Sequence, residues 1–277
     1  MFEVPIRKKA LVFSAFFSFL IVAVIFCTSY FSEKNKVVFC DVGQGDGAYI
    51  RIRNSVDLII DAGPANNQML RCLGAHMPFY DRQIEYVIIS HLQTDHYGGM
   101  LEVLKRYRIR TVFLLPFEDT KKQTKILEKA LHSRNTQIIH PVSGDSLSVL
   151  DAQILFVSPS KKRLNLPKKD KNDLSIVVDF RFPADRFLFT GDISASVLDG
   201  IGLQSFTGSS ILKIPHHGSK YGLSSQSLIN IDPQIAVISA GSNNSYGHPA
   251  KEILDMLEMH GVLIRRTDVE GDIVFSF

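Results

Sequence analysis

The chain has 277 residues, of which 45% are hydrophobic and 21% charged, so it has the composition of a globular protein with one sizeable core. Its formal net charge of +3 is too small to imply a polyanionic partner by itself. The sequence contains no internal repeat of fixed period, and no linker divides residues 36–277, which we expect to form one domain.

The N-terminal segment predicts a membrane anchor. Residues 10–32 carry no charge, and roughly 20 apolar residues in a helix are enough to cross a bilayer. Arg7, Lys8 and Lys9 precede this segment, so residues 1–9 are expected to stay in the cytoplasm. The remaining chain would then lie on the periplasmic or outer side of a single-pass cytoplasmic membrane protein. A cleaved signal peptide has the same basic start and apolar stretch, and this alternative stays open.

Short apolar runs alternate with turn residues along the rest of the chain, and three segments have helical spacing. Strands are expected over 36–42, 48–53, 57–63, 84–90, 111–116, 152–159, 175–182, 186–192, 209–215, 234–241 and 272–277. Helices are expected over 100–108, 120–134 and 250–261. Because the strands come in clusters with single helices between them, the pattern predicts an α+β fold with two sheets between helices.

Two features of the soluble part have ordinary interpretations. Cys40 and Cys72 have no metal-type spacing and do not resemble a disulfide framework, so we interpret them as small buried side chains. Residues 161–173 contain six basic side chains around a proline: Lys161, Lys162, Arg163, Lys168, Lys169 and Lys171. A solvated loop explains this segment, and a loop that contacts nucleic-acid phosphates is the alternative that needs independent support.

Histidines gather at the ends of predicted strands. Five of the nine fall beside glycines in three groups, and an aspartate ends a further strand: His91 and His96, His216 and His217, His248, and Asp192. Imidazole and carboxylate together suit zinc, manganese or iron, and two such ions can clamp a displacement at phosphorus or carbon. The grouping therefore predicts a metal site at the strand ends.

Eight segments in this order carry a resemblance to a known family. They are "FCDVGQGDGAYI", "LIIDAG", "SHLQTDHYGG", "NDLSIVV", "FLFTGDI", "LKIPHHGSK", "VISAGSNNSYGHP" and "IRRTDVEGDI". The chain resembles the metallo-β-lactamase-fold hydrolases, and specifically the soluble C-terminal catalytic domain of ComEC-type DNA-uptake (competence) proteins. The resemblance implies a four-layer αββα sandwich that binds one or two divalent metal ions, zinc or manganese, at its sheet edges.

The resemblance also implies a set of ligands. The family motif H-x-[H/D]-x-D-H matches His91, Asp95 and His96, with the weak ligand Gln93 at the variable position. Asp192 resembles the bridging carboxylate and His216 the late histidine ligand. His217 is the alternative to His216, although a supporting role through backbone hydrogen bonds is the expectation for it.

Further residues receive roles from the same resemblance. Asp95 is expected to hold the attacking water as well as metal, and His248 to approach the scissile phosphate. Asp41 is expected to orient ligand histidines, with Asp46 beside it in the early motif. Asn172 or Asp173 stands where many relatives have a histidine, which makes the site richer in oxygen and favours manganese.

The function that these observations predict is hydrolysis of DNA by a membrane-anchored phosphodiesterase or nuclease through a metal-activated water. Lys161, Lys162, Arg163, Lys168 and Lys169 are its candidate nucleic-acid contacts. Two alternatives stay open: a metallohydrolase of a small phosphoester, amide or lactam, and a binding domain that has lost catalysis because of Gln93. ComEC-type proteins have many membrane helices, whereas this chain has one candidate, so a role other than the channel is expected.

Overall fold

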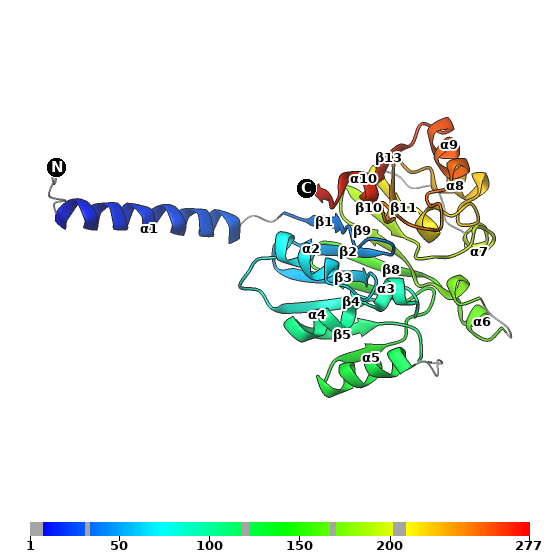
Figure 1. Cartoon of the computed structure of the whole chain (residues 1–277), viewed down its shortest axis with the longest axis horizontal. Coiled ribbons are helices and arrows are strands. Elements are labelled where there is room, and N and C mark those ends of the chain that lie inside the picture. The colour runs from blue at the N-terminus through cyan, green and yellow to red at the C-terminus, as the bar shows by residue number, and fades with distance from the viewer. Residues whose placement is uncertain (1–7, 31–33, 118–121, 167–169, 202–208) are drawn as a thin grey trace.

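Two mixed β-sheets form the centre of the molecule (Figure 1). The computed structural model describes residues 8–30, 34–117, 122–166, 170–201 and 209–277. The first sheet has the order β14-β1-β2-β3-β4-β5-β6. Its strands are β1 (Lys36–Phe39), β2 (Gly47–Ile52), β3 (Val56–Ala62), β4 (Gln83–Ile88), β5 (Arg108–Phe113), β6 (Gln137–Ile139) and β14 (Ile273–Ser276). Strands β3 to β6 run parallel, so their carboxyl ends meet at one edge.

The second sheet has the order β13-β12-β11-β10-β9-β8-β7. Its strands are β7 (Ser146–Val149), β8 (Ala152–Ser158), β9 (Val177–Arg181), β10 (Asp185–Phe189), β11 (Ser209–Lys213), β12 (Ile235–Ile238) and β13 (Leu263–Arg266). Strands β10 to β13 are parallel neighbours. A parallel connection needs a crossover, which explains why helices alternate with these strands.

Helices cover the outer faces of both sheets, and this produces four layers. On the first sheet lie α2 (Gln68–His76), α3 (Thr94–Tyr97), α4 (Met100–Arg106) and α5 (Lys122–Ser133). On the second lie α7 (Ala195–Gly200), α8 (Ser225–Ile231) and α9 (Lys251–Met259). Shorter helices are α6 (Lys161–Leu164), α10 (Thr267–Glu270), and the 3₁₀ turns η1 (Asn172–Leu174) and η2 (Pro215–Gly218).

Aromatic and aliphatic side chains fill the space between the sheets. Phe39 of β1 stacks on Phe189 of β10 with ring centroids 5.3 Å apart, and Phe113 meets Phe156 at 5.1 Å. Val178 and Phe180 of β9 are fully buried in the same cluster. Burial of this apolar area is the main force that holds the two sheets together.

Helix α1 (Lys8–Tyr30) stands apart from the two sheets (Figure 1). The apolar side chains described on it are exposed, including Phe13 and Phe19. Within the residues that the structure describes, no helix meets the length and apolarity that a membrane span requires. The predicted anchor over 10–32 extends into residues 31–33, which lie outside the described part.

The predicted two-sheet architecture is confirmed, and the predicted helices appear as α4, α5 and α9. Cys40 and Cys72 are buried as expected, but the expectation that they form no disulfide is wrong. Cys40, directly after β1, forms a disulfide with Cys72 of α2, and their Cα atoms lie 5.8 Å apart. The sequence did not reveal this pairing, because the two cysteines are separated by 32 positions and only the packing of α2 on the first sheet brings their side chains together.

Candidate metal centre

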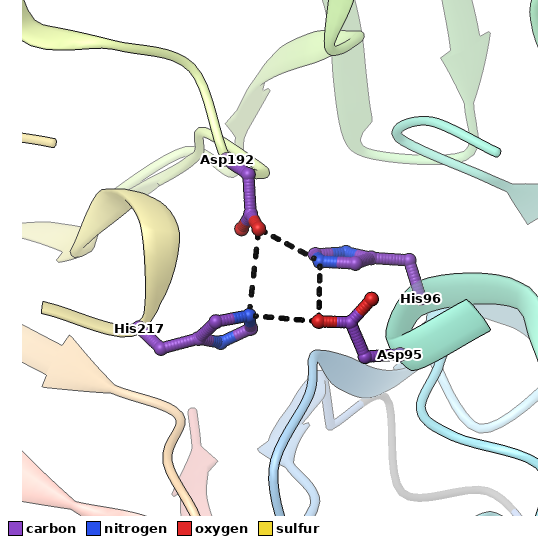
Figure 2. A group of neighbouring side chains, drawn as sticks. All are labelled: Asp95, His96, Asp192 and His217. Carbon is purple, nitrogen blue, oxygen red and sulfur yellow. Dashed lines mark ion pairs between the residues drawn. The ribbon is translucent and has the colours of Figure 1, made fainter. Parts of the chain in front are cut away.

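Four side chains converge where the strands of both sheets end (Figure 2). Asp95 and His96 lie on α3, which follows β4, Asp192 follows β10, and His217 follows β11. Each residue offers one ligand atom, and the four atoms lie within 4.8 Å of one another. The parallel strands explain this convergence, since the loops that leave their carboxyl ends come together at the same edge of the sandwich.

The Asp192 carboxylate lies between the two imidazole rings. Its Oδ2 atom is 3.2 Å from Nε2 of His96 and 3.5 Å from Nε2 of His217. Asp95 Oδ2 lies 3.4 Å from the same nitrogen of His217. The two histidines and Asp192 are almost completely buried, while a third of the Asp95 side chain is exposed. The site is therefore enclosed on the protein side and open beside Asp95.

The donor atoms of this cluster suit a divalent transition metal. The Nε2 atoms of His91, His96 and His217 and the Oδ1 atom of Asp192 are buried and make no hydrogen bond within the described residues. Buried polar atoms nearly always have a bonding partner, so this group of atoms indicates a site that binds a ligand. Two imidazole nitrogens and two carboxylates fit zinc or manganese.

Carboxylates behind the cluster orient its histidines. The Oδ2 atom of Asp61 is 2.9 Å from Nδ1 of His96, and Oδ1 of Asp46 is 3.2 Å from Nδ1 of His217. Ser90 donates its hydroxyl to Asp61 and so fixes that carboxylate at the end of β4. A hydrogen bond at Nδ1 sets the tautomer that leaves Nε2 free for a metal.

Lys213 lies buried behind the cluster and pairs with Asp46. Its Nζ atom also donates to the carbonyl of Gly191, at 3.2 Å. Burial alone would raise the pKa of Asp46, but Lys213 and His217 outweigh it and lower this pKa to about 2. Asp46 therefore stays ionised beside His217, whose Nδ1 atom donates a hydrogen bond to the carbonyl of Ser239 at 3.0 Å.

The acids and histidines also change one another's pKa. Burial opposes ionisation of Asp192, yet the neighbouring His217 and His96 hold its pKa well below its usual range. For His217 itself burial would lower the pKa, but Asp192 and Asp46 raise it well above the ordinary value. His91 differs, because burial and the nearby His96 lower its pKa to about 3. His91 is thus neutral and ready to bind a cation.

The structure places His217, and not the expected His216, in the four-residue cluster. The expected backbone hydrogen bond of His217 is also present, from its Nδ1 atom to the carbonyl of Ser239 at 3.0 Å. His217 is 2% exposed, whereas a third of the His216 side chain faces solvent, with its Nε2 atom 4.0 Å from Asp192. Both residues have left-handed backbone, with φ of 52° and 54°, an uncommon conformation outside glycine. This tight turn after β11 directs the second ring inward.

Asp41 does not have its expected role in the described part of the chain. Its carboxylate accepts from the backbone N–H of Gly43 and lies 3.8 Å from Arg71, and no contact joins it to a ligand histidine. The residue that sequence reasoning missed is Asp61, whose motif "LIIDAG" was recognised without its carboxylate being chosen. The signal was available, since Asp61 ends a buried strand beside a glycine.

Gln93 and Asn172 contact each other. The side-chain amide of Gln93 donates a hydrogen bond to Oδ1 of Asn172, and both lie outside the four-residue cluster. His91 also lies outside it, although its ring centroid is 4.1 Å from that of His96. Asp173 instead accepts from the backbone of Ser194. At the expected first metal position the structure therefore has one imidazole, that of His91, and the side-chain amides of Gln93 and Asn172, which are hydrogen-bonded to each other.

A small pocket of about 60 Å³ lies beside the ligand cluster and is lined by His91. Leu92, Leu115, Pro116, Leu164 and Leu174 form its walls with Lys171. Leu164 belongs to α6, so the basic segment borders this pocket, with Lys161 and Lys162 exposed and Arg163 half-buried. Lys168 and Lys169 lie outside the described residues. The walls of the pocket are therefore mainly apolar, and basic side chains of Lys171 and of α6 lie next to it.

The last predicted site residue, His248, lies at the solvent side of the cluster. Its ring packs against His217 at 6.5 Å with an angle of 28° between the planes, and its Nδ1 atom is buried without a partner in the described chain. Burial, His217 and His216 together lower its pKa below the ordinary value. A neutral imidazole therefore lies beside the buried ring of His217.

Two sheets with helices on their outer faces are the fold that this chain shares with solved metallo-β-lactamase-fold proteins. YhfI from Bacillus subtilis, a metallo-β-lactamase-fold protein, aligns with a TM-score of 0.60 and 11% identity over 88% of this chain and 100% of that one. No family model matches the chain.

Proteins with similar sequences confirm the resemblance to ComEC-type competence proteins that the motifs indicated. ComE operon protein 3 of Bacillus subtilis is 27% identical over 89% of this chain and 33% of its own length. Competence protein ComA of Neisseria gonorrhoeae is 27% identical over 88% of this chain and 32% of its own. The chain thus spans about a third of the length of these relatives.

Proposed function

We propose that this protein is a metal-dependent phosphodiesterase that hydrolyses DNA. The observation that carries the proposal is the enclosed group of Asp95, His96, Asp192 and His217. The Nε2 atoms of its two histidines make no hydrogen bond among the described residues and point toward the two carboxylates. A divalent cation held there would polarise a phosphoryl oxygen and acidify water, so the reaction needs no serine or cysteine nucleophile. The competence proteins among the relatives support DNA as the substrate.

The chain's own residues have distinct roles in this proposal. His96 and His217 would hold the cation. Asp61 positions the ring of His96, and Asp46 together with the carbonyl of Ser239 positions the ring of His217. Asp95, the most exposed of the four ligands, accepts the proton of the attacking water. His248 donates a hydrogen bond to the phosphate or to the leaving oxygen, since its imidazole is neutral and its Nδ1 atom has no partner among the described residues.

Electrostatics favour a polyanion at this edge. Lys171 lines the pocket beside His91, and α6 contributes Lys161, Lys162 and Arg163 next to it. Phosphate contacts release counterions, so a cationic border raises the affinity for DNA in a salt-dependent way. The pocket wall formed by Leu164 connects this cationic segment to the metal centre.

The catalytic domain is proposed to lie outside the cytoplasm, anchored by the apolar N-terminal segment. The Cys40–Cys72 disulfide supports this location, because structural disulfides persist in oxidising compartments and are rare in the cytosol. A reporter that is active only outside the cytoplasm, fused after Phe277, should give a signal. A matched reporter that is active only in the cytoplasm should stay silent, and the reverse result would place the domain inside.

Digestion of DNA tests the proposed activity. Full-length protein in detergent is loaded with zinc or manganese and incubated with single-stranded and double-stranded DNA, and the metal content is measured in parallel. Cleavage should require metal and should disappear in Asp192→Ala, since the carboxylate between the two histidines is lost. Metal-loaded protein that cleaves neither DNA nor a small phosphodiester would contradict the proposal.

A further inference from the structure

Aromatic rings form a continuous series from the metal centre to the surface. The centroid of His96 lies 5.4 Å from that of His217, which lies 6.5 Å from that of His248. The ring of His248 is in turn 5.9 Å from that of Tyr246, and the two planes differ by 24°. From His217 outward the rings are therefore stacked nearly parallel, at distances typical of offset aromatic pairs.

Tyr246 ends this series at the solvent. Its side chain is 71% exposed although one face packs on His248, so the other face is open. Single exposed apolar side chains are common and need no explanation by themselves. Tyr246 is distinguished by its position, because only one ring separates it from a ligand of the metal centre.

The loop that carries Tyr246 is held in one conformation. The Oδ1 atom of Asn244 accepts from the backbone N–H groups of Tyr246 and His248, at 3.2 and 3.0 Å. The Nδ2 atom of the same side chain donates to the carbonyls of Gly241 and His248. A ring fixed in this way loses little conformational freedom when a partner stacks on it, and that favours binding.

We propose that the open face of Tyr246 is a subsite that stacks one nucleobase of the DNA strand whose phosphate lies at the metal centre. The inference rests on the proposed function, since it names the part of the substrate that this site recognises. Stacking continues the existing series by one more ring, and every base has a π-face, so the subsite discriminates little between sequences. Tyr246 acts in binding and is separate from the residues that hold the cation.

A base can occupy this subsite only if one of its faces is free. In a duplex both faces are covered by neighbouring base pairs, and exposing one costs unstacking energy. The subsite therefore selects single strands and unpaired ends over continuous duplex. Tyr246→Ala should weaken binding of a single strand by roughly 5- to 150-fold, the range that loss of one stacked base produces.

Binding is measured on the metal-loaded full chain in detergent, with phosphorothioate linkages in the strands so that they resist cleavage. A short fluorescent oligothymidylate is compared with an abasic strand of the same length and charge. Tyr246→Phe keeps the ring and should bind as the wild type does. Phe79→Ala is the matched control, since Phe79 is 84% exposed and precedes β4 at the opposite edge from the metal centre.

The expected result is that Tyr246→Ala loses affinity for oligothymidylate but not for the abasic strand. Equal affinity of wild type and Tyr246→Ala for oligothymidylate would overturn the inference, as would an equal loss for both strands or no binding of either. Hydrolysis of a small phosphodiester by the same metal-loaded preparations tests the proposed function separately. If Tyr246→Ala loses affinity as expected but no phosphodiester is hydrolysed, the proposed function is contradicted. If the phosphodiester is hydrolysed but Tyr246→Ala binds as the wild type does, only the stacking subsite is contradicted.

Discussion

The Oδ2 atom of Asp61 lies 2.9 Å from Nδ1 of His96, and both side chains are buried. This contact turns the opposite nitrogen of His96 toward Asp192, at 3.2 Å. A carboxylate that holds a ligand histidine in this way fixes its tautomer and raises its basicity. The geometry of the metal centre therefore depends on Asp61, which is not one of the four clustered residues.

Asp61→Asn is expected to reduce metal affinity by about 10- to 100-fold, the usual effect of removing such a supporting carboxylate. The amide can still accept from the N–H of Ser90, so the fold should survive. Asp41→Asn is the control, because Asp41 accepts only from the nearby backbone and contacts no ligand histidine in the described chain. Affinity is measured by competition with a chelator, and equal losses in both variants would contradict this role for Asp61.

The pH dependence of stability should differ between metal-free and metal-loaded protein. Although burial opposes it, Asp192 raises the pKa of His96 and His217 well above the ordinary value. Such groups stabilise the fold fully below the unfolded pKa of about 6.5, and this contribution is lost as pH rises through the folded pKa. The Tm of metal-free protein should therefore fall as pH rises above neutrality.

Metal affinity should change in the opposite direction, because a bound cation must displace the protons on His96 and His217. The increase in Tm on adding zinc should grow with pH, and binding should release protons into a weakly buffered solution. Calorimetry in buffers of different ionisation enthalpy measures that release. Metal binding that is independent of pH would show that these histidines are not the ligands.

Gln93→His should raise the metal content per chain. The imidazole is a better ligand for zinc than the amide, and the change also removes the hydrogen bond from Gln93 to Asn172. A higher metal content is not expected to raise the rate of hydrolysis, since no carboxylate is in place to orient the new imidazole ring. Elemental analysis compares this variant with wild type and Asp192→Ala, which should bind less. If all three bind no metal and none hydrolyses a phosphodiester, the domain is a binding module.

Removing charge from α6 should weaken DNA binding and flatten its dependence on salt. The change is Lys161, Lys162 and Arg163 to glutamine, and each lost phosphate contact should lower the log–log salt slope by about 0.7 to 0.9. The same number of charges can be removed from the exposed face of α5, at Lys122, Lys125 and Lys129, as a control. An unchanged slope in the α6 variant would identify that segment as a solvated surface.

The Cys40–Cys72 disulfide should be present in protein isolated from cells. Alkylation in denaturant should label one of the three cysteines before reduction and all three afterwards. Replacing both bonded cysteines by serine should cost roughly 3–4 kcal/mol of stability, because the bond closes a loop with a sequence separation of 32. Three reactive thiols in unreduced protein would contradict both the bond and the proposed location.

The sequence by itself predicted the two-sheet architecture and three residues of the cluster, Asp95, His96 and Asp192. It also placed His91 and His216 among the ligands, and it omitted Asp61. Alternating apolar runs specify strands through side-chain periodicity, and the same polar residues after several buried strands indicate one shared edge. His96 and Asp192 could be chosen because they lie in the loops after predicted strands, whereas Asp95 was chosen through the motif that the chain shares with the family it resembles.

Only the tertiary structure decided which neighbour points inward and which distant residues meet. The choice between His216 and His217 depends on the left-handed turn after β11, and two adjacent histidines give no periodicity from which to read it. The contact of Asp61 with His96 and the bond between Cys40 and Cys72 join separate elements. Local patterns carry no information about such pairs, since the distance between them is set by how helices and strands pack over the whole core.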